Sequence, residues 1–104
     1  MSFTDKVVLV TGASRGIGRA IAETFVARGA KVVGTATSES GAEAISAYLG
    51  ENGCGMALNV TSQESIEAVF AAIKARFGDI DILINNAGCN QFAWLEDQQR
   101  GDHP

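Results

Sequence analysis

The chain has 104 residues, of which 46% are hydrophobic, and it carries a formal net charge of −4 with a pI near 4.8. A chain of this length supplies one domain and buries roughly 60 to 68% of the surface that the unfolded chain exposes. Because the balance is acidic and the eight basic residues are scattered, the sequence offers no basic field for a phosphate backbone, and a nucleic-acid partner is not expected.

The first third of the chain predicts a strand, a helix and a second strand. Residues 6–11 form a nearly unbroken apolar run with β-branched side chains, which is typical of a strand buried on both faces of a parallel sheet. A helical pattern then begins at Ile17 and ends at Gly29, where a helix C-cap is expected. Residues 31–36 predict the second strand.

The middle of the chain repeats this order. Ser40 and Glu43 form a capping box, which predicts the start of a second helix that ends near Gly50. Residues 56–60 predict a short third strand.

A third helix and a fourth strand complete the predicted elements. Thr61 and Glu64 repeat the capping pattern before apolar residues at helical spacing, and Gly78 ends that helix. Residues 80–84 predict the fourth strand. The alternation of strands and helices predicts an α/β fold, namely the N-terminal part of a doubly wound, Rossmann-like parallel sheet with strand order 3-2-1-4.

Three glycines between the first strand and the first helix indicate a phosphate site. Gly12 lets the chain turn out of the strand, Gly16 lets the backbone approach a pyrophosphate, and Gly18 lets the helix pack closely. The helix N-terminus would face the phosphates with its N–H groups and its positive dipole end. The spacing is G-x-x-x-G-x-G, and glycines at a strand-to-helix turn can also serve geometry alone.

The end of the second predicted strand bears on the choice of cofactor. Residues 34–38 contain no carboxylate that would hold a ribose 2′-hydroxyl or repel a 2′-phosphate. Thr37 and Ser38 can donate hydrogen bonds to a 2′-phosphate, and Arg15 offers a charged fork. We therefore expect NADP(H) in preference to NAD(H). The alternative is a solvated Arg15 and a turn-forming Thr37.

Three asparagines lie at the carboxyl ends of predicted strands, and each allows two interpretations. The Asn59 amide can reach an adenine with Val60 packed beside it, or Asn59 can form a turn before a helix cap. Asn85 and Asn86 can bind a ribose, or one of them can brace neighbouring strands.

Catalytic and metal-binding candidates are few. Tyr48 is the only tyrosine, and because Asn52 stands four residues later it has no local lysine partner; we expect it to pack its ring on a helix surface. His103 lies in a C-terminal segment without an orienting partner, and Cys89 is either a reactive thiol or a buried one. Neither a disulfide framework nor a metal site is predicted, because Cys54 and Cys89 form no Cys-x-x-Cys pair.

The sequence does not lead us to expect a targeting segment. Residues 1–6 lack the apolar core of a signal peptide, and no apolar run approaches the ~20 residues of a membrane span. A reducing cytoplasm without a membrane partner is therefore expected.

Taken together, residues 11–18, the Asn59-Val60 pair and residues 85–88 resemble the short-chain dehydrogenase/reductase family, over residues 1 to about 88. Within that family, residues 34–38, 44–46 and 59–61 are similar to the members that reduce 3-oxoacyl chains carried on acyl carrier protein.

This resemblance implies which residues bind the cofactor. It places residues 12–15 on the NADP phosphates, Thr37 near the 2′-phosphate, and Asn59 and Val60 at the adenine. It places Asn86 at the ribose on the nicotinamide side. The implied cofactor-binding set is Gly12, Ala13, Ser14, Arg15, Gly16, Ile17, Gly18, Thr37, Asn59, Val60, Asn86, Ala87 and Gly88.

The resemblance also implies what a complete enzyme does. A hydride passes from NADPH to the 3-oxo carbon of an acyl chain while a tyrosine protonates the oxygen, supported by a serine, a lysine and an asparagine. No residue of this chain matches those catalytic positions.

We therefore expect residues 1–88 to be an NADP-binding half-domain and residues 89–104 to be a divergent tail without the catalytic half. On this interpretation the chain alone has little or no turnover, and its exposed fourth strand invites self-association. The alternatives are a non-catalytic nucleotide-binding or interaction module that docks on an intact reductase, and a product without a role.

Overall fold

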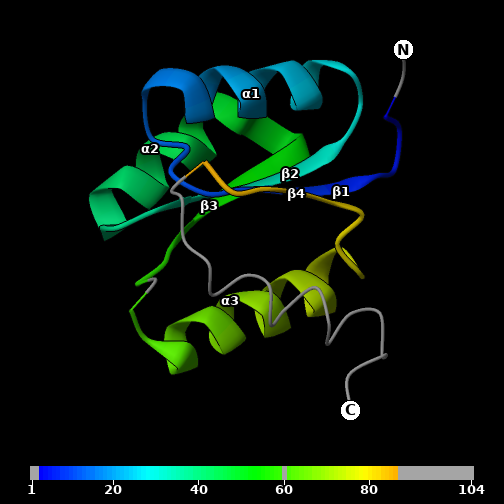
Figure 1. Ribbon diagram of the computed structural model, residues 1–104. Helices are drawn as coiled ribbons and strands as arrows, with labels where there is room; N and C mark the ends of the chain where they lie inside the picture. Colours follow the sequence, from blue (N-terminus) through cyan, green and yellow to red (C-terminus); the bar gives the residue numbers. More distant parts are fainter. Residues whose placement is uncertain (1–2, 60, 87–104) are drawn as a thin grey trace.

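The computed structural model describes residues 3–59 and 61–86, which form a parallel sheet covered by helices (Figure 1). Its elements are β1 (Val7–Val10), α1 (Gly16–Ala27), β2 (Lys31–Ala36), α2 (Glu39–Leu49), a 3-10 turn η1 (Gly50–Asn52), β3 (Gly53–Ala57), α3 (Gln63–Arg76) and β4 (Ile82–Ile84). Among these helices, none is long and apolar enough to pass through a membrane.

The sheet confirms the predicted topology. Its four strands lie in the order β3-β2-β1-β4, and all three neighbouring pairs are parallel. In register, Val10 lies between Gly34 of β2 and Ile84 of β4. The carboxyl ends of β1, β2 and β4 therefore meet at one edge of the sheet, and the glycine-rich segment leaves the sheet at that edge.

Apolar side chains from both faces of the sheet build two cores. Figure 1 shows α1 and α2 on one face and α3 on the other. In β1, Val8 and Val10 pack in the cluster that includes Ala22 of α1, whereas Val7 and Leu9 pack in the cluster that includes Ile73 of α3. All four β1 side chains are buried, which confirms the prediction of a strand covered on both faces.

Two helices begin at serines, but not at the positions expected from the sequence. The Ser38 hydroxyl accepts a hydrogen bond from the Gly41 amide at 3.2 Å, so Ser38 and not Ser40 caps α2. The Ser62 hydroxyl accepts from the Ser65 amide at 3.3 Å and caps α3 in place of Thr61. The predicted capping boxes were wrong in register because the cap is the last residue with extended backbone, and Ser40 already lies within α2.

The third strand also differs from its predicted bounds. Residues 56–60 were expected, whereas β3 spans Gly53–Ala57. Helix α2 lies so close to β3 that a Cβ on Gly55 would stand 2.0 Å from the Ala42 carbonyl oxygen. Only glycine fits at position 55, so β3 lacks the β-branched residues that indicate a strand. The predicted strand therefore began too late in the chain.

The fourth strand is shorter than expected because a side chain replaces part of its ladder. The Asp81 amide donates to the Val7 carbonyl at 2.9 Å, and the Asp81 carboxylate accepts from the Val7 amide, also at 2.9 Å. Regular pairing with β1 begins only at Ile82. Within the described sheet β4 is an edge strand, and self-association through it stays a prediction.

Candidate nucleotide-binding site

The glycine-rich loop, defined here as residues 11–15 and continued by Gly16 and Gly18 of α1, connects β1 to α1 at the point where the strand order reverses. The chain proceeds outward from β1 through β2 to β3 on one side, and β4 lies on the other side of β1. In open α/β sheets, ligands bind outside the carboxyl ends of the strands at such a point. The loop therefore lies where this fold places a ligand.

Neighbouring strands hold the start of the loop through its backbone. The Thr11 amide donates to the Ile84 carbonyl at 3.0 Å, and the Ala13 amide donates to the Thr35 carbonyl at 2.9 Å. The loop thus extends the pairing of β1 with both of its neighbours before the chain turns into α1. Its position is fixed from two sides.

The two asparagines after β4 hold the loop through their side chains. Asn86 Nδ2 donates to the Gly12 carbonyl at 3.2 Å, and Asn85 Oδ1 accepts from the Thr11 hydroxyl at 3.2 Å. This is the bracing geometry that the sequence left open as an alternative. The role of Asn86 at a ribose stays a prediction, and Ala87 and Gly88 lie outside the described residues.

Gly18 allows α1 to approach the loop. A Cβ at Gly18 would stand 2.1 Å from the Gly12 carbonyl oxygen and 2.8 Å from Asn86 Nδ2. Gly12 itself has φ +64°, a left-handed conformation that glycine adopts at no steric cost. These two glycines have the turning and close-packing roles expected of them.

The N-terminus of α1 suits an anion. The cap residue Arg15 has extended backbone, and among the described residues no side chain caps this end and no acidic residue occupies its first turn. A Cβ on Gly16, the first residue of α1, would meet no atom within 4 Å in the described structure, so there is free space beside the start of the helix. Backbone N–H groups without a side-chain cap and a positive dipole end beside this free space form a cradle that suits a phosphate group.

Ile17 stands beside that cradle with an exposed apolar side chain. Its relative exposure is 73%, and it is the exposed large hydrophobic residue of the described structure. The resemblance includes Ile17 among the cofactor-binding residues, and that role stays a prediction.

The N-terminus of α2 lies next to the loop. A Cβ on Gly41 would stand 3.6 Å from Ser14 Cβ. Thr37 and Arg15 are exposed, so both side chains are accessible at this edge of the sheet. The Ser38 hydroxyl instead caps α2 and lies 3.2 Å from the Ser40 hydroxyl, which limits its use toward a ligand.

Asn59 forms a turn before α3. Its side-chain oxygen accepts from the Thr61 amide at 3.0 Å and from the Thr61 hydroxyl at 2.6 Å. Its own amide donates to the Ser65 hydroxyl at 3.0 Å. The turn reading of Asn59 therefore describes its geometry, while an adenine contact stays a prediction; Val60 lies outside the described residues.

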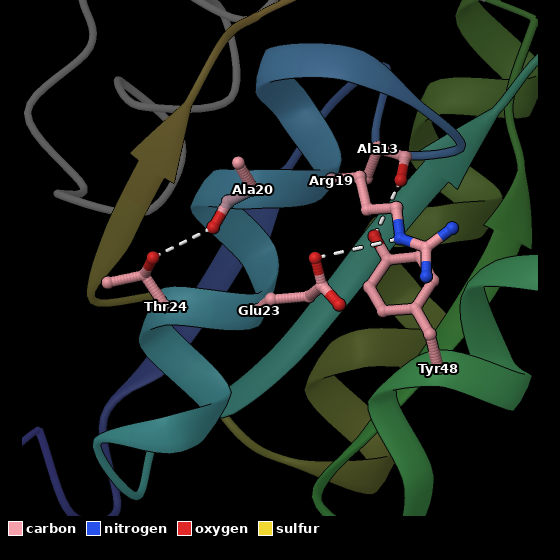
Figure 2. Close-up of polar contacts among 6 residues, drawn as sticks. All are labelled: Ala13, Arg19, Ala20, Glu23, Thr24 and Tyr48. Atoms are coloured by element: carbon pink, nitrogen blue, oxygen red, sulfur yellow. Dashed lines mark hydrogen bonds and ion pairs between the residues drawn. The ribbon is translucent and has the colours of Figure 1, made fainter.

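Tyr48 holds the loop from α2, a role that the sequence did not predict. Its hydroxyl donates to the Ala13 carbonyl at 2.5 Å, and the Arg19 guanidinium stacks over its ring at 4.7 Å (Figure 2). Burial raises the pKa of Tyr48 to about 12, with Glu23 adding to the rise and Arg19 opposing it. Tyr48 lies three residues after the buried Ile45 and so shares its helix face, which indicates inward packing of the ring but not the partner of its hydroxyl.

The described cysteine is remote from this chemistry. Cys54 is a free, buried thiol in β3, and burial raises its pKa, which disfavours the reactive thiolate. Cys89 and His103 lie outside the described residues. Within the described part of the chain, no three or more histidine, cysteine or acidic side chains gather as a metal site would require.

A family model described as short chain dehydrogenase matches residues 6–102 of this chain. The chain belongs to the short-chain dehydrogenase family. The match continues beyond residue 88. The division of the chain at that residue stays a prediction.

Several relatives carry one name, 3-oxoacyl-[acyl-carrier-protein] reductase FabG. The chain is 61% identical over 105 residues to the protein of Escherichia coli K12, a match that covers 98% of this chain and 43% of that relative. It is 72% identical over 88 residues to the protein of Vibrio cholerae, covering 85% of this chain and 36% of that relative. The chain therefore spans less than half the length of these short-chain dehydrogenases.

Proposed function

We propose that this chain binds NADP(H) and is the cofactor-binding portion of a reductase that acts on 3-oxoacyl groups carried on acyl carrier protein. The observation that carries the proposal is the N-terminus of α1, which no described side chain caps and which has free space beside Gly16, at the point where the strand order reverses. The identity to reductases of that name supports the substrate class.

The residues that would hold the cofactor follow the loop and the strand ends. Residues 12–18 would hold the pyrophosphate through backbone N–H groups and the dipole of α1. Thr37 would contact the 2′-phosphate, Asn59 and Val60 the adenine, and residues 86–88 the ribose on the nicotinamide side. When bound, the cofactor supplies the hydride that reduces a carbonyl.

Preference for NADP(H) over NAD(H) rests on two exposed side chains and on the sequence beside them. Arg15 and Thr37 are accessible at the edge of the sheet that carries the loop. Residues 34–38 hold no carboxylate, so nothing in that stretch repels a 2′-phosphate. A guanidinium can pair with the negative charge of a phosphate through two hydrogen bonds, whereas a 2′-hydroxyl is uncharged.

Hydride transfer by these 104 residues alone is not expected. The one tyrosine, Tyr48, donates its hydrogen bond to the Ala13 carbonyl, and its pKa is raised to about 12, which makes it a weaker acid than an ordinary tyrosine. The acyl carrier protein would be a partner of the complete enzyme.

Calorimetric titration of the chain with NADPH and with NADH tests the proposal. We expect saturable binding of NADPH that is tighter than binding of NADH. An Arg15→Gln variant removes the charge and keeps a polar side chain, and Lys31→Gln, at the opposite end of β2, is the matched control. The proposal fails if neither cofactor binds. Reduction of a 3-oxoacyl thioester by the isolated chain would instead contradict the expected lack of turnover.

A further inference from the structure

The Ala13–Ser14 peptide group of the glycine-rich loop is held by a side chain from helix α2. The Tyr48 hydroxyl, on α2, donates to the Ala13 carbonyl at 2.5 Å across 35 residues of sequence. Figure 2 shows the phenol reaching the loop from α2, below the start of α1. The preceding peptide group is already held at both ends, by Asn86 on the Gly12 carbonyl and by Thr35 on the Ala13 amide.

The orientation of this carbonyl determines the direction of the next amide. The described residues contain no cis peptide bond, and in a trans peptide the C=O and N–H groups point in opposite directions. Tyr48 draws the Ala13 carbonyl toward α2, so the Ser14 N–H points away from the phenol. Arg15 and the uncapped N-terminus of α1 follow directly in the chain.

We infer that Tyr48 is a positioning residue for the cofactor phosphates: through the Ala13 carbonyl it fixes the peptide plane that presents the Ser14 N–H to the site. The inference rests on the proposed function, since it needs a phosphate ligand. Tyr48 does not itself touch that ligand; it acts through the Ala13–Ser14 peptide.

The ring of Tyr48 is held from the other side by α1. The Arg19 guanidinium lies 4.7 Å from the ring centroid, and Arg19 Nε lies 3.6 Å from Glu23 Oε1 (Figure 2). The phenol therefore contacts α1 through its face and the loop through its hydroxyl. Movement of the loop relative to either helix would break one of these contacts.

The test is a Tyr48→Phe variant of the 104-residue chain, because phenylalanine keeps the ring and its contact with Arg19 while removing the hydroxyl. We expect the dissociation constant of NADPH to rise about fivefold, which corresponds to about 1 kcal/mol, the usual contribution of one hydrogen bond. Binding of adenosine, which lacks phosphates, should not change.

Thr24→Val is the matched control. The Thr24 hydroxyl also donates to a backbone carbonyl, that of Ala20 at 2.8 Å, but it lies farther along α1 from the loop (Figure 2). This variant should bind NADPH as the wild type does. Both variants are examined by amide NMR without ligand, and only Tyr48→Phe should shift the Ser14 signal.

The outcomes separate the inference from the proposed function. If wild type binds NADPH and Tyr48→Phe binds it equally well, with only the free energy of unfolding reduced, Tyr48 is purely structural and the inference is overturned. An equal loss of adenosine and NADPH binding would also overturn it. If the wild type binds no NADPH, the proposed function fails first and the inference falls with it.

Discussion

Substitution of Gly18 by alanine sets two physical effects against each other. Alanine is a better helix former than glycine by about 1 kcal/mol, and Gly18 lies in the first turn of α1 with room for no side chain. A Cβ there would stand 2.1 Å from the Gly12 carbonyl oxygen, where ordinary contacts begin at 3.4 Å. Helix α1 would have to move away from the loop by about 1 Å, on the scale of a core overpacked by a methyl group.

The magnitude follows from these contacts. Overpacking of this kind costs about 1 to 3 kcal/mol. The same Cβ would stand 2.8 Å from Asn86 Nδ2 and displace its hydrogen bond to Gly12, a loss of about 1 kcal/mol. Against the gain in helix propensity, we expect Gly18→Ala to lower the free energy of unfolding by about 2 kcal/mol, a large part of the 5 to 15 kcal/mol typical of a domain.

Urea unfolding with linear extrapolation measures this change. Ala20→Gly, at an exposed position of the same helix, measures the propensity effect alone and should cost about 1 kcal/mol. If Gly18→Ala were as stable as the wild type or more stable, propensity would dominate. The close packing of α1 on the loop would then be refuted.

Three further predictions concern pH, cofactor choice and the core. Tyr48 has a folded pKa of about 12 against an ordinary value of 10.0, so its contribution to stability is complete below pH 10 and is lost as pH rises through 12. The difference in the free energy of unfolding between wild type and Tyr48→Phe, measured with urea, should therefore be constant below about pH 10 and shrink above it. Arg15→Gln should weaken NADPH binding about tenfold and NADH binding less than about twofold by calorimetry, and equal losses would argue against a contact with the 2′-phosphate. Ile73→Ala, at a fully buried position of α3, should lower the free energy of unfolding by about 3 kcal/mol, whereas Ile17→Ala, at an exposed position, should change it by less than about 0.5 kcal/mol. Similar changes for the two variants would contradict the difference in their burial.

The elements and their order were predictable from the sequence because local pattern and tertiary environment agree. The run of residues 6–11 is apolar on both faces, and β1 is buried on both faces. The strand order followed from the alternation of strands and helices, which leaves few topologies available.

Predictions failed where a tertiary contact decided the outcome. The close approach of α2 requires Gly55 within β3, and this obscured the strand pattern. The caps of α2 and α3 depend on where the extended backbone ends, which the spacing of serines and glutamates does not fix.

The site was predictable in its backbone and less so in its side chains. The glycine pattern located the loop because Gly12 has a left-handed conformation and Gly18 leaves no room for a side chain. The hydrogen bond of Tyr48 to Ala13 spans 35 residues, so no local pattern announces it. From the sequence, the Asn86 amide could bind a ligand or hold a neighbouring strand equally well. Only the structure shows that it donates to the Gly12 carbonyl.

The proposed function requires that the loop between β1 and α1 bind the phosphates of NADPH. The most direct measurement is an amide nitrogen–proton NMR spectrum of the chain recorded during titration with NADPH. We predict dispersed signals, with saturable shifts concentrated at Gly12, Ser14 and Thr37. A dispersed spectrum that does not respond to NADPH at those residues would contradict the claim.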